Sequence, residues 1–148
     1  MELIIGKVKD THWEIDDQSI KVYAKQQIIL GKPKLKNEIL LNDIDNIDMY
    51  FTSQPMGSAK NTVGVFSYSH DIMFNVKMKN DENVVFSILT STNRDELIQA
   101  IDYLVSHNIK INDEYHLIAI IKNKDQKIWD GIEEIIKTNH FPYVNHKI

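Results

Sequence analysis

The spacing of hydrophobic residues changes once along the chain, near residue 90. Val84 to Leu89 is a β-prone run that ends in three hydroxyl residues. After them, apolar residues recur at helical spacing, namely Leu97, Ile98, Ile101, Leu104 and Val105. The pattern predicts a strand followed by an amphipathic helix over Asn93–Val105. Everything before it is predicted as strands and turns, so this helix is the first element able to cover the open side of a sheet.

The first ninety residues contain nine short β-prone segments, some of which continue one another, and this pattern predicts roughly seven strands. The segments are Leu3–Val8, His12–Ile15, Ile20–Tyr23, Ile28–Leu30, Asn37–Leu41, Ile44–Phe51, Val63–Phe66, Ile72–Met78 and Val84–Leu89. Asp16–Ser19 predicts a hairpin turn, and Gly31–Pro33 predicts a second hairpin tip. Thr52–Asn61 holds a proline and a glycine among small polar residues, so it is predicted to be a mobile loop.

The last forty residues add a second amphipathic segment. Tyr115–Ile121 is apolar with an ambiguous period, and Asp125–Thr138 carries a helical stripe. The stripe consists of Ile128, Trp129, Ile132, Ile135 and Ile136. The two run-plus-helix segments superpose at an offset of 31 residues, which is either a β–α repeat or, as we favour, a coincidence of two stripes. We therefore expect a β domain with a closing helix over residues 1–108 and a helical extension over 109–148.

The segment Glu38-Ile39-Leu40-Leu41-Asn42-Asp43-Ile44 resembles the "I-P-L-x-D-I" strand junction of bacterial pleckstrin-homology-like (PH-like) and GRAM-type domains, with Leu40 in place of the proline. The order of predicted elements over about residues 10–108 is also similar to that family. The resemblance implies an α+β fold, mainly an antiparallel β sandwich or partly open barrel closed by a helix. It also implies a non-catalytic module that binds lipids, peptides or proteins.

Composition and charge narrow the choice of partners. Phosphoinositide-binding members of the family have a basic first hairpin, whereas Asp16 and Asp17 occupy the corresponding turn here and would repel phosphate. A net charge of -4 with Arg94 as the only arginine disfavours nucleic acid. The absence of cysteine and of a basic leader or a long apolar run fits a cytoplasmic protein without disulfides.

Residues capable of catalysis or metal binding do not form a recognisable motif. The six histidines show no metal-type spacing, and no cysteine completes a set; they are His12, His70, His107, His116, His140 and His146. Ser67–Asp71 contains serine, histidine and aspartate side by side, but strand neighbours point to opposite faces, so we interpret it as a turn. Asp43, Asp45 and Asp48 lack the glycine and closing glutamate of an EF-hand and are predicted to form a polar strand face. We predict no catalytic residue, no metal and no cofactor.

Two features are candidate binding residues. Lys32, Lys34 and Lys36 concentrate positive charge at the second hairpin tip, although alternating lysines also protect an exposed strand edge. Trp129 lies on the C-terminal stripe, where a core position is the simpler interpretation and a ligand contact the alternative. The favoured hypothesis is a protein-interaction or scaffold module, with homodimerisation through the C-terminal helix as one option. The alternative is a small enzyme whose site surrounds the 52–61 loop.

Overall fold

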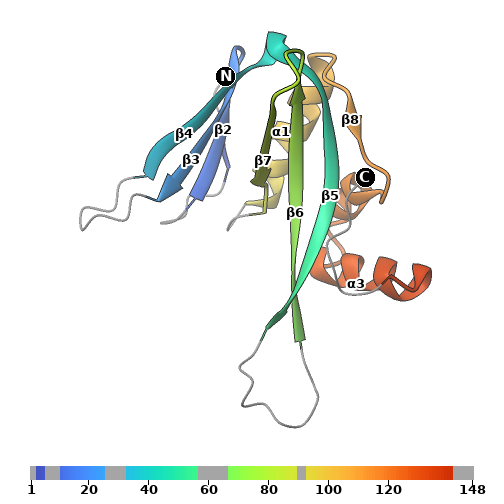
Figure 1. Ribbon diagram of the computed structural model, residues 1–148. Coiled ribbons are helices and arrows are strands. Elements are labelled where there is room, and N and C mark those ends of the chain that lie inside the picture. Colours follow the sequence, from blue (N-terminus) through green and yellow to red (C-terminus); the bar gives the residue numbers. More distant parts are fainter. Residues whose placement is uncertain (1–2, 6–10, 26–32, 57–66, 90–92, 142–148) are drawn as a thin grey trace.

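The computed structural model describes residues 3–5, 11–25, 33–56, 67–89 and 93–141. Their strands form two four-stranded sheets, and three α-helices follow in the chain (Figure 1). In the described residues, seven strands precede the first α-helix, and the predicted strand segments at 28–30 and 63–66 lie outside the described residues. The fold is therefore α+β, and β4 and β7 end their sheets without pairing to each other, so the strands do not close a barrel.

The first sheet is an antiparallel meander in the order β1-β2-β3-β4. Its strands are β1 (Leu3–Ile5), β2 (Thr11–Ile15), β3 (Ser19–Lys25) and β4 (Pro33–Leu40). The predicted turn between β2 and β3 is confirmed, because the Asp16 carboxylate accepts hydrogen bonds from the backbone N–H groups of Gln18 and Ser19, both at 2.8 Å. At the second predicted tip, Pro33 is already the first residue of edge strand β4, a position that tolerates proline. Gly31 and Lys32 lie outside the described residues.

The second sheet has the order β7-β6-β5-β8. A 3-10 turn, η1 (Leu41–Asp43), carries the chain into it, and its strands are β5 (Ile44–Met56), β6 (Ser67–Met78), β7 (Asn83–Ser87) and β8 (Ile111–Asn112). Figure 1 shows the long β5–β6 hairpin running beyond the other strands. The short β8 pairs in parallel with β5 at Ile47 and Asp48.

Two predicted connections are strands instead. Thr52–Met56 continues β5, and Ser67–Asp71 begins β6, because the two segments pair residue by residue from Thr52↔Asp71 to Met56↔Ser67. The predicted loop was wrong for residues 52–56, and the predicted turn was wrong for 67–71. Their polar composition suggested loops, but cross-strand pairing outweighs local propensity. Residues 57–66 are outside the described part of the chain.

The predicted helix after residue 90 is confirmed as α1 (Arg94–Ser106). The Asn93 side chain caps it by accepting from the N–H groups of Asp95 at 2.9 Å and Glu96 at 3.4 Å. The buried face consists of Leu97, Ala100, Ile101 and Leu104. Val105 was assigned to this face but is 53% exposed, since it lies at the edge of the stripe.

The C-terminal part forms α2 (Leu117–Lys122) and α3 (Ile128–Asn139). The ambiguous run Tyr115–Ile121 thus becomes mostly helix, whereas the run before α1 forms β7, so the offset of 31 residues is not a strand–helix repeat. The predicted second helix is confirmed with its start moved from Asp125 to Ile128. Figure 1 shows α3 beside the β5–β6 hairpin.

One hydrophobic core joins these layers. Trp13 of the first sheet packs against Phe74 and Phe86 of the second, with ring centroids 6.0 Å and 5.6 Å away. The same core includes residues of α2 and α3, namely Leu117, Ile121, Ile132 and Ile136. The C-terminal helices therefore pack on their own chain. Among the described helices, none is long and apolar enough to cross a membrane.

Candidate functional site

Ser53 of β5 and His70 of β6 form a buried polar pair in the β5–β6 hairpin. Along β6, alternate residues Ile72, Phe74 and Val76 are fully buried, and the same alternation turns His70 inward. Ser53 of β5 is its cross-strand partner. Both residues are 4% exposed, and the Ser53 hydroxyl lies 2.7 Å from His70 Nδ1. A row of apolar positions therefore ends in a buried polar pair that requires hydrogen-bond partners.

Helix α3 contributes the Glu133 carboxylate and the Trp129 ring to this site. Glu133 Oε1 lies 2.6 Å from His70 Nε2, and the Glu133 side chain is 30% exposed. Trp129, one helical turn earlier, meets the His70 ring edge-to-face with centroids 6.0 Å apart. The helix is held there by Ile132 and Ile136, which are buried in the core. The chain thus brings Ser53, His70 and Glu133 together from three separate segments.

The order of these groups decides what chemistry they support. In a serine hydrolase the nucleophile faces Nε2 of histidine and the carboxylate faces Nδ1. Here the serine faces Nδ1 and the glutamate faces Nε2. A neutral ring that donates from Nε2–H to Glu133 and accepts from the Ser53 hydroxyl satisfies both bonds. This geometry suits a connection that ties α3 to the hairpin, and it leaves Ser53 enclosed.

A cavity of about 280 Å³ adjoins this network; we call it the Asp71 cavity. It is lined by Thr52, Gln54, Ser69, His70, Asp71, Ser87, Leu89 and Trp129. Asp71 Oδ1 accepts from the Ser87 hydroxyl at 2.6 Å and from the Ile72 N–H at 2.9 Å. Burial raises the pKa of Asp71, although the two hydrogen bonds oppose this effect. Burial, followed by the Asp71 charge, raises the pKa of Tyr50 as well.

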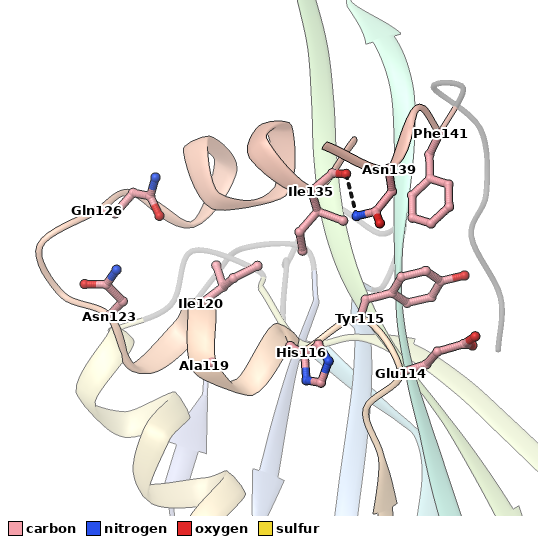
Figure 2. Close-up of a pocket in the computed structure, with 10 residues that line it drawn as sticks. All are labelled: Glu114, Tyr115, His116, Ala119, Ile120, Asn123, Gln126, Ile135, Asn139 and Phe141. Carbon is pink, nitrogen blue, oxygen red and sulfur yellow. Dashed lines mark hydrogen bonds between the residues drawn. The ribbon is translucent and has the colours of Figure 1, made fainter. Parts of the chain in front are cut away.

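A second cavity, of about 500 Å³, is a groove between α2 and α3, which we call the α2–α3 groove (Figure 2). Figure 2 shows Ile120 and Ile135 facing one another across it, with Tyr115 and Phe141 at one end and Asn123 and Gln126 at the other. The remaining lining residues are Glu114, His116, Ala119 and Asn139. The groove therefore combines apolar walls with amide groups, a composition suited to side chains and backbone of a peptide.

Aromatic contacts form the Tyr115 end of this groove. Tyr115 packs edge-to-face on Phe141 and on Phe51, with centroids 5.7 Å and 5.2 Å apart. Burial, with a smaller contribution from Glu114, raises the pKa of the Tyr115 hydroxyl. The phenol therefore remains neutral and able to donate a hydrogen bond at physiological pH.

The predicted binding residues are not gathered in one place. Lys32 lies outside the described residues, and Lys34 lies on β4. Lys36 is exposed on β4 and lines a third cavity, of about 250 Å³, beside β7. Trp129 is 43% exposed on α3 and lines the Asp71 cavity instead. The lysines and the tryptophan are therefore parts of different surfaces.

The histidines and the aspartates have separate surroundings. His107, His116 and His140 lie at helix ends, while His12 stacks on Tyr23 in the first sheet. The described residues contain no group of three potential ligands for a metal ion. Asp48 is buried rather than on a polar strand face, with Lys77 Nζ at 2.6 Å and the Asn112 amide at 2.7 Å. Asp43 lies in η1, so only Asp45 and Asp48 belong to the strand.

Sequence reasoning missed Ser53, Glu133 and the role of His70. One signal was present: extending the alternation of Ile72–Met78 back by one step places His70 on the core side. No local signal identifies Glu133, because its proximity to His70 depends on how α3 packs. Comparison with protein-family models, with curated proteins and with solved structures gives no match, so the resemblance to PH-like domains stays a prediction.

Proposed function

We propose that the chain is a non-catalytic module of PH-like type that binds a partner protein in the cytoplasm through the α2–α3 groove. The observation that carries the proposal is the groove itself, a cavity of about 500 Å³ walled by two isoleucines and two aromatic rings. Three amide side chains on its rim, Asn123, Gln126 and Asn139, offer donors and acceptors to a peptide backbone. The order of seven antiparallel strands in two sheets followed by α1 supports the PH-like assignment.

Anionic partners are not expected at the first hairpin. The backbone N–H groups of Gln18 and Ser19 lower the pKa of Asp16, so this carboxylate is charged at neutral pH. A phosphoinositide approaching the β2–β3 turn would meet that charge and Asp17. The net charge of -4 similarly opposes binding to nucleic acid.

Peptide selection on the full-length protein tests the proposal. Peptides enriched from a displayed library are expected to shift backbone amide resonances of α2 and α3. Ala119→Arg places a long charged side chain at an exposed groove position and should weaken these peptides at least about tenfold, through lost burial. Gln99→Arg, which adds the same charge at an exposed position of α1, is the control for charge and should bind normally. Peptides that bind Ala119→Arg as tightly as wild type would show that the α2–α3 groove is not their binding site.

The alternative function is a small hydrolase, because Ser53, His70 and Glu133 form a continuous hydrogen-bonded chain. Its test is labelling of the folded protein with a fluorophosphonate, which forms a covalent bond only to an activated serine. We expect no labelling, since Ser53 is enclosed and faces Nδ1. Labelling that disappears in Ser53→Ala would establish the hydrolase and contradict a purely binding role.

A further inference from the structure

The Asp71 cavity holds a carboxylate without a cationic partner. Asp71 Oδ1 receives two hydrogen bonds, whereas Oδ2 has no hydrogen bond or ion pair in the part of the chain that the structure describes. None of the lining residues that the structure describes is lysine or arginine. A partly buried carboxylate lacking a counter-charge is costly in the free protein. A ligand that supplies a positive charge would remove this cost, so the cavity favours a cationic ligand.

The other walls of the cavity suit the same kind of ligand. Thr52, Ser69 and Ser87 present hydroxyl groups, and Gln54 presents an amide, so acceptor oxygens surround the carboxylate. Trp129 is 43% exposed, and its contact with His70 fixes the indole. Aromatic faces attract ammonium and guanidinium groups, and tryptophan does so most strongly. A carboxylate and an indole on one cavity therefore form a complementary pair for a cation.

Anions and metal ions fit this cavity less well. A phosphate or carboxylate ligand would be repelled by Asp71 and would find no lysine or arginine among the described residues of the cavity wall. A divalent metal would need more acidic or histidine ligands than the one carboxylate and one imidazole here, and the imidazole nitrogens already face Ser53 and Glu133. An organic cation with an alkyl stem is attracted by Asp71 and does not need further acidic or histidine ligands.

We propose that the Asp71 cavity binds the ammonium or guanidinium group of a lysine or arginine side chain presented by a partner protein. The cavity, at about 280 Å³, accommodates a single side chain rather than a folded segment. Its position on the hairpin and α3 separates it from the α2–α3 groove, with which it shares no lining residue. The proposal adds a second recognition site and does not depend on occupation of the groove.

Two-dimensional NMR of the 15N-labelled full-length protein tests this proposal. The chain has two tryptophans, so Trp129 reports on the cavity while the core residue Trp13 serves as an internal control. The probes are acetyl-Gly-Gly-Arg-Gly-Gly-amide, its lysine and glutamine counterparts, n-butylguanidinium, and methyl β-glucoside. We expect the arginine or lysine peptide to shift the Trp129 indole resonance saturably and to leave Trp13 unchanged. The glutamine peptide should not bind.

Matched variants separate the role of Asp71 from that of overall charge. Asp71→Asn keeps the acceptor oxygen used by Ser87 and Ile72 but removes the charge, and should weaken the cationic peptides at least about tenfold. Asp130→Asn removes the same charge from an exposed residue next to Trp129 that does not line the cavity, and should leave binding unchanged.

Four results would overturn the proposal. They are the absence of any shift with the cationic peptides, equal binding of the glutamine peptide, binding of the glucoside that is indifferent to Asp71→Asn, and equal loss in Asp130→Asn. n-Butylguanidinium binding much more tightly than the arginine peptide would overturn the assignment to a protein side chain, because the cavity would then exclude the peptide backbone. These outcomes do not bear on whether peptides bind the α2–α3 groove. Each of the two proposals can therefore be overturned without the other.

Discussion

At the residue scale, the polar side chains of β5 and β6 near Ser53 and His70 determine the chemistry of the Asp71 cavity and its surroundings. Ser53 and His70 occupy positions that would be apolar farther along the same strands, and Glu133 completes their hydrogen bonds. Asp71 points to the neighbouring cavity, because adjacent residues of β6 alternate between faces. Adjacent residues of one strand thus contribute a hydrogen-bonded polar network and a carboxylate that has no counter-charge among the described residues.

Asp71 makes stability depend on pH. Burial raises its pKa above 3.8, so the folded protein holds this proton more tightly than the unfolded chain does. The protonated Asp71 carboxyl contributes fully to stability below the pKa that it has in the unfolded chain. This contribution is lost as the pH rises through its pKa in the folded protein. Asp71→Asn should therefore raise the melting temperature at pH 7, with a difference from wild type that shrinks toward pH 4. Calorimetry over this range measures it.

Exposed Asp17→Asn is the control for the pH series, since it removes one carboxylate without removing a buried one. Its melting temperature should follow that of wild type between pH 4 and pH 7. A melting temperature of Asp71→Asn below wild type at pH 7 would show that the ionised carboxylate stabilises the fold, contrary to this account.

At the element scale, α1 closes the strand-rich body and α3 packs on α2. Each of α1 and α3 buries one apolar face in the same core. In addition, α3 approaches α2 closely at Gly131. Each contact makes a distinct prediction for a single substitution.

Ile101→Asp should unfold the protein. Ile101 is 1% exposed, and an unpaired carboxylate in its place would destabilise the fold by about 4 kcal/mol or more, a large part of the stability of a small domain. Ile101→Val, which removes one methylene group, should lower stability by only about 0.5–1.5 kcal/mol. Urea unfolding compares the two. An unchanged midpoint for the aspartate variant would mean that this helix face is not buried.

Gly131→Ala tests the contact between α2 and α3. In an open helix this change would stabilise by about 1 kcal/mol. Here an added Cβ would lie 2.6 Å from Ile120 Cγ2, so we expect destabilisation of about 1–3 kcal/mol. In an Ile120→Ala background the clash is removed and the same change should become favourable. Stabilisation in the wild-type background would contradict the close approach of the helices.

At the scale of the whole molecule, one core connects both sheets and all three helices. The C-terminal stripe is largely used inside the chain, because Ile132 and Ile136 are buried there while Trp129 stays half exposed. Assembly through α3 would therefore have little apolar surface available apart from Trp129 and its neighbours. Two chemically different cavities both use α3, because Ile135 and Asn139 line the α2–α3 groove and Trp129 lines the Asp71 cavity.

Light scattering of the full-length protein should give the mass of a monomer, and Trp129→Glu should leave that mass unchanged. The reason is that the apolar face of α3 already packs on its own chain. Trp129→Phe serves as the control that keeps an aromatic ring without adding charge. A wild-type dimer that becomes a folded monomer in Trp129→Glu would show that α3 is a homodimer contact.

The sequence by itself determined the elements whose signals are local. Asn93 followed by a periodic stripe predicted α1 to within one residue at each end, and Asp16 predicted the β2–β3 turn. Alternation in Ile72–Met78 likewise predicted a strand. These features follow from side-chain spacing and from hydrogen bonds within a few residues, both of which are visible in the sequence.

Only the tertiary structure decided the rest. Thr52–Met56 and Ser67–Asp71 have the composition of loops and become strands because they pair with each other across the hairpin. Glu133 meets His70 across 63 residues of sequence, and Asp71 shares a cavity with Trp129 only because α3 packs beside β6. Such contacts depend on where the core places whole elements, so spacing along the chain carries no information about them.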